Sequence, residues 1–334
     1  MRNLAEDVQD ITNALFAMNT LQSLSNVETL FLTGATGFFG KWLLDSTLGT
    51  HIRVYALSRN PDLFLKKYPR YLKADNIFFL NGDVRDFVLP KRVEIQYIIH
   101  AATSTVADSS VAAQNELYSS IVDGTKKILE MRAEKLLYVS SGGVYGKQPP
   151  TLPQFTEDYK CMPNNAYGHG KLEAERLCSE SDIPTVIVRP FAFIGPYLPL
   201  DAHFAAGNFI NDALHKRPSI INGDGTPLRS YLYPSDLCEW LWKSLIHGEK
   251  GEIFNVGSDE AVSILELAQM INEVAGSSSA EIIVKEKSLT NALPARYIPN
   301  IDLIKNRLGV TIKVSLKEAI KRTLEFHKEV KSQL

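Results

Sequence analysis

The chain has 334 residues, of which 45% are hydrophobic and 22% charged, and its formal net charge at pH 7 is -2. This length fits one large α/β domain plus a smaller lobe, and the composition is ordinary for a globular protein. The near-neutral charge excludes a general electrostatic attraction to nucleic acids or to membrane surfaces.

Several absences narrow the class of protein further. The three cysteines are far apart and form no C-x-x-C pair, so we expect reduced thiols and a cytoplasmic protein. The N-terminal segment carries acidic and polar residues throughout, unlike a signal peptide, and no apolar run reaches the length of a membrane span. No cluster of His, Cys and Asp has metal-ligand spacing, so no metal is predicted.

The first predicted element is a helix within residues 4–24, where apolar residues recur at helical spacing. It precedes the first strand, so residues 1–27 are expected to form an N-terminal helical extension. Such a helix can cover either the core or a partner subunit, and the sequence leaves both open.

From residue 28 onward, short apolar runs alternate with segments of helical spacing. The predicted helices cover residues 38–48, 110–132 and 165–181. The predicted strands cover residues 29–33, 53–58, 76–81, 97–101, 135–140 and 185–190. This alternation is typical of a parallel sheet covered by helices on both faces, so residues 28–190 are predicted to form a Rossmann-type, doubly wound α/β dinucleotide-binding domain.

The pattern changes after Pro190. The following segment is rich in Pro, Gly and aromatic residues and is expected to be irregular. Later, Ser263-x-x-Glu266 and Ser315-x-x-Glu318 are capping boxes that open two helices. Residues 191–334 are therefore expected to form mainly a small α/β substrate-binding lobe, with some segments returning to the Rossmann domain.

The segment TGATGFFG places Gly34, Gly37 and Gly40 between the first strand and the first helix of the domain. The first glycine permits a tight turn, the second lets the backbone approach a pyrophosphate, and the third lets helix and strand pack closely. The helix N-terminus also offers free N–H groups to the phosphates. Because the glycines follow the first strand of a βαβ pattern, they predict a dinucleotide site.

The end of the second strand bears on the choice between NAD and NADP. An NAD site usually has an acid there, but this chain has Arg59, and the first acid is Asp62. A guanidinium suits a 2′-phosphate, although a solvent-facing arginine is the alternative. We therefore favour NADP slightly over NAD.

Two later strand ends have residues that fit a cofactor. Asp83 follows the third strand, where it can bond the adenine amino group or simply cap a turn. Ala101 and Ala102 are small enough to let the chain pass the cofactor, whereas His100 is expected to pack.

Tyr167 and Lys171 are four residues apart and so share a helix face. A nearby ammonium favours a phenolate and lowers the pKa of a tyrosine, which can then exchange a proton with an alcohol as hydride moves. Ser141, at a strand end, can hold the substrate oxygen or serve only in a turn. His169 is expected to pack or to face solvent, and Cys161 to be a structural thiol, with an extra acid/base role as the alternative.

In their order and spacing, these segments resemble the extended short-chain dehydrogenase/reductase family, in particular its nucleotide-sugar epimerases and dehydratases. The resemblance runs from about Thr29 to near the C-terminus. The segments that carry it are TGATGFFG, GDVRD, HAAT, SSGGVYG, AYGHGK, VIVRPFAFIGP and GDGTPLRSYLYPSDL. It implies that Ser141, Tyr167 and Lys171 are catalytic and that Lys171 also holds the nicotinamide ribose.

The resemblance also implies two sets of binding residues and a partner. The cofactor-binding residues would be Gly34, Thr36, Gly37, Phe38, Phe39, Gly40, Arg59, Asp83, Val84, Ala101, Ala102, Tyr167, Lys171 and Pro190. Pro190, with Arg189, would border the nicotinamide and the sugar. The diphosphate of a nucleotide sugar would lie by Asn208, Arg229 and Arg296, since arginine binds such groups bidentately. A homodimer through the helices 110–132 and 165–181 is expected.

The chain departs from this family where the catalytic serine is followed by Gly142 and Gly143. Family 4,6-dehydratases usually carry an Asp-Glu pair there, and decarboxylases usually keep the Glu. Ile121 and Ser230 also replace residues usual in the family, which indicates a divergent member.

The expected function is an NAD(P)-dependent nucleotide-sugar 4-epimerase, which forms a transient keto sugar by hydride transfer with Tyr167 as acid/base. The alternative is an NADPH-dependent keto-sugar reductase, which the Arg59 argument favours. Gly142 and Gly143 disfavour a dehydratase. The retained Tyr167 and Lys171 disfavour a dinucleotide-binding protein without catalysis.

Overall fold

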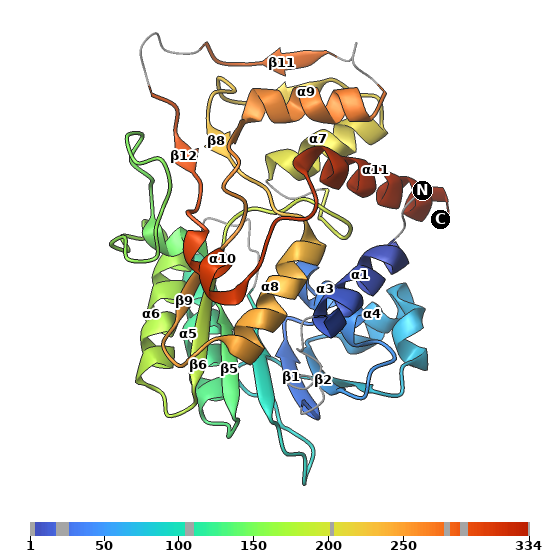
Figure 1. Cartoon of the computed structure of the whole chain (residues 1–334), viewed down its shortest axis with the longest axis vertical. Coiled ribbons are helices and arrows are strands. Elements are labelled where there is room, and N and C mark those ends of the chain that lie inside the picture. Colours follow the sequence, from blue (N-terminus) through green and yellow to red (C-terminus); the bar gives the residue numbers. More distant parts are fainter. Residues whose placement is uncertain are drawn as a thin grey trace.

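The structure is a computed structural model that describes residues 4–17, 27–103, 110–200, 204–276, 281–287 and 293–332. Within those ranges, seven parallel strands form one sheet in the order β3-β2-β1-β4-β5-β6-β9 (Figure 1). The strands are β1 (Thr29–Thr33), β2 (Arg53–Ser58), β3 (Ile77–Asn81), β4 (Tyr97–His100), β5 (Lys135–Val139), β6 (Thr185–Pro190) and β9 (Ile253–Val256). This strand order confirms the predicted Rossmann-type sheet.

The strand predictions agree with the structure to within one residue at each end. They succeeded because the central strands are apolar along their whole length, as burial on both faces requires. Every residue of β1 is buried, and so is every residue of β6.

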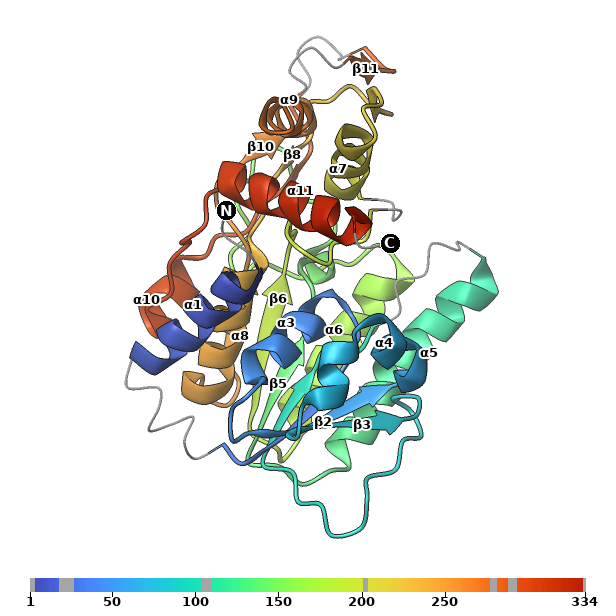
Figure 2. The ribbon, with the colours of Figure 1, turned by 90° about the vertical axis from the view of Figure 1, so that its right-hand side faces the viewer.

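Helices cover both faces of the sheet (Figure 2). On one face lie α3 (Phe38–Thr47) and α8 (Pro234–His247), and on the other lie α5 (Val111–Leu129) and α6 (Ala166–Glu180). The short helices α4 (Pro61–Lys67) and η1 (Pro69–Lys73) follow β2. Both tryptophans of α8, Trp240 and Trp242, are fully buried, which explains why this late helix lies with the sheet.

The N-terminal helix α1 (Leu4–Ala17) packs against α8 and α3, so it covers the core of its own chain. Its Asp7 is buried and accepts hydrogen bonds from the Tyr233 hydroxyl and from Nη1 of Arg322, the latter at 2.6 Å. Residues 18–26, which include the rest of the predicted helical segment, lie outside the described residues.

The second lobe is stacked on one end of the sheet (Figure 1). Its helices are α7 (Ala205–Leu214), α9 (Ile264–Val274) and α11 (Leu316–Ser332), while α10 (Asp302–Leu308) packs on β9 and α8. Its strands are β7 (Ser219–Ile221), β8 (Leu228–Arg229), β10 (Val262–Ser263), β11 (Ile282–Val284) and β12 (Arg296–Tyr297).

The structure bears directly on the two predicted capping boxes. Ser263 and Glu266 exchange both hydrogen bonds at the start of α9, which confirms the first box. At the second, the Ser315 hydroxyl accepts from the N–H of Glu318, and the Glu318 carboxylate accepts from Arg322. None of the helices in the described ranges has the length and apolar character that a membrane crossing requires.

Candidate active site

The glycine turn joins β1 to α3 and brings the start of that helix against the sheet. Gly34 has φ +71°, and a Cβ there would lie 2.5 Å from the carbonyl oxygen of Ala101. A Cβ on Gly40 would lie 2.2 Å from the carbonyl oxygen of Gly34. These approaches are the tight turn and the close helix–strand packing that the sequence predicts, and they leave a side-chain-free cradle at a helix N-terminus.

The other predicted residues of this turn offer backbone groups. Gly37 caps α3, and its own N–H bonds to the Gly34 oxygen at 3.0 Å. The rings of Phe38 and Phe39 turn aside to pack against Phe193, with ring centres 6.5 and 5.0 Å away. The N–H groups in the first turn of α3 are therefore available to bind a pyrophosphate. Thr36, which lies in the same loop, is half-buried.

At the ends of β2 and β3, Arg59 and Asp83 interact through their charges. Arg59 is exposed. The Asp83 carboxylate accepts from the backbone N–H of Arg85 at 3.0 Å and from its Nε at 2.7 Å, and Arg85 lowers the pKa of Asp83. The turn-capping alternative for Asp83 is thus observed, and its contact with adenine stays a prediction.

The residues after β4 lie directly against Gly34 of the glycine turn. Ala101 and Ala102 are half-buried, and the N–H of Ala102 bonds to the Thr33 hydroxyl at 3.1 Å. His100 is buried between Thr33 and Thr125, and burial lowers its pKa to about 3. His100 therefore packs, as predicted.

Val84 and Pro190, two further residues of the predicted cofactor site, are both buried, and their contact with a cofactor stays a prediction. Val84 packs against Gly124 of α5, where a Cβ would lie 2.6 Å from its Cγ1. Pro190 ends β6 in register with Val256.

Arg189 does not border an open site. Its guanidinium is buried and bonds to both carboxylate oxygens of Glu175, to the Tyr145 hydroxyl and to the Glu157 carbonyl. The expectation that Arg189 lines the nicotinamide and the sugar is therefore wrong, because its donors are used in an internal ion pair.

Tyr167 and Lys171 share one face of α6, with Nζ of Lys171 6.0 Å from the centre of the Tyr167 ring. Lys171 is buried, its Nζ donates to the carbonyl of Val139 at 2.8 Å, and burial lowers its pKa to about 7 against the opposing charge of Glu175. Burial raises the pKa of Tyr167, and the nearby Ser141 side chain offsets part of that rise. The expected lowering by the ammonium is therefore wrong for this structure, because burial dominates.

Ser141 follows β5 and caps the 3-10 helix η2 (Gly142–Tyr145), with its Oγ accepting from the Gly143 N–H at 3.0 Å. A Cβ on Gly143 would lie 3.3 Å from Ser141 Oγ and 3.5 Å from a ring carbon of Tyr167, so the fold brings all three predicted catalytic residues together. The prediction missed Tyr297 of β12, whose hydroxyl would lie 2.6 Å from a Cβ on Gly142, the residue after this serine.

The two glycines after Ser141 lie against filled space. A Cβ on Gly142 would lie 2.6 Å from the Tyr297 hydroxyl and 2.8 Å from the Phe191 ring. A Cβ on Gly143 would lie 3.3 Å from Ser141 Oγ. At Gly142 the room that an acidic side chain would need is occupied by Tyr297 and Phe191.

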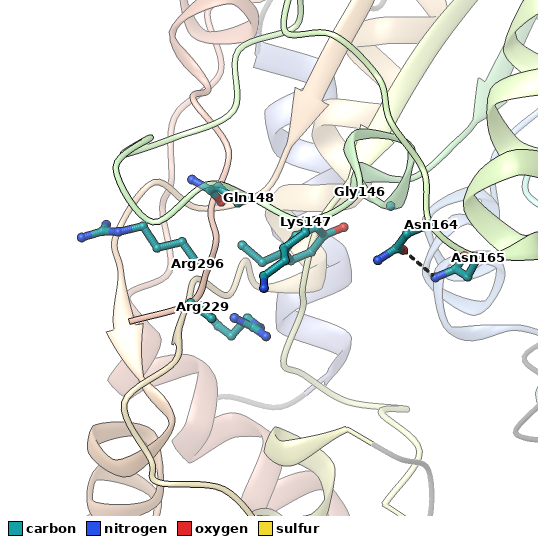
Figure 3. A pocket seen from close by; sticks show the side chains of 10 residues that line it. Gly146, Lys147, Gln148, Asn164, Asn165, Arg229 and Arg296 are labelled. Atoms are coloured by element: carbon teal, nitrogen blue, oxygen red, sulfur yellow. Dashed lines mark hydrogen bonds between the residues drawn. The ribbon is translucent and has the colours of Figure 1, made fainter. Parts of the chain in front are cut away.

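A cavity of about 340 Å³ opens beside this group (Figure 3). It is lined by Gly143, Gly146, Lys147, Gln148, Asn164, Asn165, Arg229, Ala295, Arg296 and Tyr297. Its charged lining residues are the cations Lys147, Arg229 and Arg296, none of them balanced by an acid among the residues named. Such a cavity suits an anionic ligand, and the predicted arginines meet here although β8 and β12 are far apart in the chain.

Three observations complete the comparison with the predicted residues. Among the described residues, the buried Nε of Arg296 has no hydrogen-bond partner, as expected of an arginine that binds an anionic ligand. Asn208 lies exposed on α7 and does not line this cavity, so its role stays a prediction. Lys147 was missed, although it directly follows the SSGGVYG segment.

The remaining candidates have structural environments. Burial raises the pKa of the Cys161 thiol, and its Sγ contacts the Tyr159 carbonyl, which favours a structural thiol. His169 is exposed on α6, as one of the two expectations stated. The described ranges hold no group of three or more His, Cys, Asp or Glu side chains that could bind a metal ion.

Comparison with known proteins identifies a family and several relatives that cover most of this chain. The model of the NAD dependent epimerase/dehydratase family matches residues 30–257. The chain is 28% identical over 324 residues to the dTDP-D-glucose 4,6-dehydratase of Bos taurus. This alignment covers 91% of this chain and 90% of the relative.

Solved structures share the fold over nearly their whole length. The UDP-glucuronic acid 4-epimerase from Bacillus cereus, in complex with UDP-glucuronic acid and NAD, matches with a TM-score of 0.79 at 23% identity, covering 90% of this chain and 99% of that one. RMD from Pseudomonas aeruginosa, complexed with NADPH, matches with a TM-score of 0.73 at 22% identity, covering 91% and 99%.

Proposed function

Because the chain belongs to the NAD dependent epimerase/dehydratase family, whose members are NAD(P)-dependent enzymes acting on nucleotide sugars, we propose that it is a nucleotide-sugar 4-epimerase. The observation that carries the proposal is the group Ser141, Tyr167 and Lys171 at the end of β5, beside a cavity lined by three cations. The group can move a proton, and the cavity suits the diphosphate of the substrate.

The proposed chemistry uses each side chain in one role. Tyr167, as the phenolate, takes the proton of the sugar hydroxyl and returns it after the keto sugar has turned in the cavity. Ser141 holds the sugar oxygen near Tyr167, and Lys171 supplies positive charge beneath the ring. The glycine cradle would hold a nicotinamide cofactor, which would supply reversible hydride transfer at the sugar carbon. The cycle has no net oxidation.

The absence of an acidic pair after Ser141 supports an epimerase over a 4,6-dehydratase. Elimination of water across two carbons needs an acid and a base besides Tyr167, and Gly142 and Gly143 offer no side chain for either. The space at Gly142 is filled by Tyr297 and Phe191, so an acidic side chain at that position would not fit without displacing them.

One observation favours a second candidate, an NADPH-dependent keto-sugar reductase. Arg59 is exposed at the end of β2, where an acid would favour NAD, and an exposed guanidinium there suits a 2′-phosphate. We accordingly propose a preference for NADP over NAD. A neighbour of the same fold, RMD, is complexed with NADPH.

The bound nucleotide and the product separate the two candidates. The purified protein is denatured and the released nucleotide is identified. Fresh protein is then incubated with NADP⁺ or NADPH and with UDP-, dTDP-, GDP- and CDP-sugars, each offered as the 4-hydroxy and as the 4-keto sugar, while absorbance at the NADPH band is followed. An epimerase forms the C4 epimer of one sugar with no net absorbance change. Oxidation of one NADPH per product would establish the reductase instead, and turnover of neither kind would overturn both.

The arginines of the cavity predict a specific binding defect. Arg229→Ala should raise KM about 10- to 100-fold with little change in kcat, since a charge-assisted hydrogen bond contributes about 1.5–3 kcal/mol equally to ground and transition states. The control is Lys160→Ala, an exposed cation outside the cavity lining. Unchanged inhibition of the Arg229 variant by the free nucleoside diphosphate would contradict the assignment.

We further propose that the protein works in the cytoplasm as a homodimer joined through α5 and α6. These helices pack side by side, and Val111 and Tyr118 leave apolar surface on α5, where their exposed fractions are 77% and 39%. We also propose that the lobe formed mainly by residues 191–334 holds the substrate.

A further inference from the structure

The ends of β2 and β3 form one corner of the predicted dinucleotide site. Ser58 of β2 pairs with Asn81 of β3 in the parallel register, and the N–H of Gly82 donates to the carbonyl of Ser58 at 3.1 Å. Arg59 directly follows Ser58, and Asp83 directly follows Gly82, so the two charged residues leave the sheet at neighbouring points. In a Rossmann fold the carboxyl ends of the strands face the cofactor, and the end of the second strand faces the adenosine ribose.

The cation and the acid at this corner have opposite effects on the choice of cofactor. A carboxylate bonds the free ribose hydroxyls of NAD and repels the 2′-phosphate of NADP, whereas a guanidinium attracts that phosphate. The Arg85 side chain lowers the pKa of Asp83, so the carboxylate is ionised at neutral pH. A 2′-phosphate at the exposed Arg59 would therefore meet a negative charge from the neighbouring strand end unless that charge is neutralised.

Arg85 neutralises Asp83 through three hydrogen bonds. The backbone N–H and Nε of Arg85 donate to Oδ1 at 3.0 and 2.7 Å, and Nη2 donates to Oδ2 at 3.2 Å. On the other side of the guanidinium, Nη1 lies 2.8 Å from Oε1 of Glu116 on α5. A forked ion pair of this kind is stronger and more directional than a single contact. Both oxygens of Asp83 are thus bonded to Arg85.

We propose that Arg85 is a specificity-determining residue for the cofactor: by pairing with Asp83, it removes the negative charge that would otherwise repel a 2′-phosphate at Arg59. The inference rests on the proposed preference for NADP. It concerns only the discrimination between the two cofactors, which share their adenosine and nicotinamide groups and differ in the 2′-phosphate.

The first test is Arg85→Ala, which leaves the Asp83 carboxylate with the backbone N–H alone. The protein is dialysed against an equimolar mixture of NADP⁺ and NAD⁺, and the bound nucleotides are released by denaturation and quantified. We expect the bound ratio of NADP to NAD to fall about 5- to 10-fold, because an unpaired unit charge near the phosphate has an effect of this size in solvated surroundings. An unchanged ratio would overturn the proposal.

A purely structural role of Arg85 has a different signature. A change in the shape of the turn after β3 would weaken NADP and NAD together and leave their ratio in place. The conservative variant Arg85→Lys keeps the positive charge next to Asp83 and loses the fork, so its ratio should lie closer to that of the unaltered protein than to that of Arg85→Ala. A ratio as low as in Arg85→Ala would show that neutralisation is not the cause.

Asp83→Asn separates neutralisation from a direct contact between Arg85 and the phosphate. In the Arg85→Ala background, this second change removes the exposed charge. The bound ratio should then return to near the value of the unaltered protein, since the two residues act as one pair. A ratio that stays low in the double variant would show that Arg85 attracts the phosphate itself, and would overturn the proposed neutralisation.

A second readout does not involve the nicotinamide half of the cofactor. Adenosine 2′,5′-bisphosphate and AMP differ only in the 2′-phosphate, and each is titrated into the NADP-loaded protein until the cofactor is displaced. Arg85→Ala should weaken the bisphosphate and leave AMP unchanged; equal weakening of both would overturn the proposal. If the unaltered protein holds NAD more tightly than NADP, the proposed preference fails, while the shift caused by Arg85→Ala still decides the role of Arg85.

The matched control is Arg307→Ala. The Arg307 side chain is 35% exposed, against 31% for Arg85, and it also bridges two carboxylates, those of Glu249 and Glu252, at 2.6 and 2.7 Å. It lies on α10, which packs on β9 at the edge of the sheet opposite to β3. The bound ratio should be unchanged in this variant. An equal fall would show that the effect of Arg85 is a general loss of positive charge, which would overturn the proposal.

Discussion

Tyr167→Phe is expected to reduce turnover by about 10²- to 10⁴-fold, the usual contribution of a general acid/base. The Tyr167 ring and the Ser141 hydroxyl both lie against Gly143, and Nζ of the buried Lys171 is 6.0 Å from the ring centre, so no other proton-transferring group among these neighbours is arranged in the same way. Phenylalanine keeps the ring and its packing, so the fold should persist. The measurement is kcat with the preferred nucleotide sugar, together with the dissociation constant of the cofactor.

The control for this variant is His169→Ala, which changes an exposed side chain two residues further along α6. Its turnover should match that of the unaltered protein. Full activity of Tyr167→Phe on every sugar that the protein accepts would remove the acid/base assignment, and with it the proposed mechanism.

Glu175→Gln should have the largest effect on stability. The carboxylate of Glu175 accepts hydrogen bonds from Ser140 and from both Nε and Nη2 of Arg189, at 3.0 and 2.7 Å for the latter two, and both ion-pair side chains are only 5% exposed. Removing one partner leaves a buried charge uncompensated, so we expect a loss of about 3–5 kcal/mol in the free energy of unfolding. Urea unfolding followed by circular dichroism measures it.

The same helix offers a matched control. Glu173 pairs with Arg176 on the solvent side of α6, where the side chains are 33% and 52% exposed. Glu173→Gln should change stability little, because exposed ion pairs are screened by solvent. Equal unfolding midpoints for the two variants would show that the buried pair is not a main support of the fold.

Glu175 also links stability to the catalytic group. It lies one turn after Lys171, and its charge opposes the lowering of the Lys171 pKa by burial. Loss of that charge should lower the Lys171 pKa further below about 7, so that less ammonium is present at neutral pH. The carboxylate of the buried Glu175–Arg189 pair thus helps to keep Lys171 protonated, which the sequence did not indicate.

Local patterns were enough for much of the Rossmann domain. The strands from Thr29 to Pro190 are apolar runs, and the glycine turn needs only three residues close together in sequence, so both can be recognised from short windows. Tyr167 and Lys171 could be placed on one helix face because the helical period alone brings residues four apart together.

The errors arose where distant segments decide a residue's surroundings. Arg189 matched a motif, yet its guanidinium pairs with Glu175. The pKa of Tyr167 was expected to be lowered by Lys171, yet burial raises it. Neither burial nor the identity of a charge partner on another element can be read from the spacing of residues along the chain.

The sequence by itself determined the strand–turn–helix that cradles a dinucleotide, the Tyr167–Lys171 pair and the family, since each depends on contacts between near neighbours. Only the tertiary structure decided that α1 covers the core, that Lys147 joins Arg229 and Arg296 around one cavity, and that the Tyr297 hydroxyl lies against Gly142. The reason is physical: these contacts form only when the second lobe and the N-terminal helix pack onto the sheet, and packing between distant segments leaves no period in the sequence.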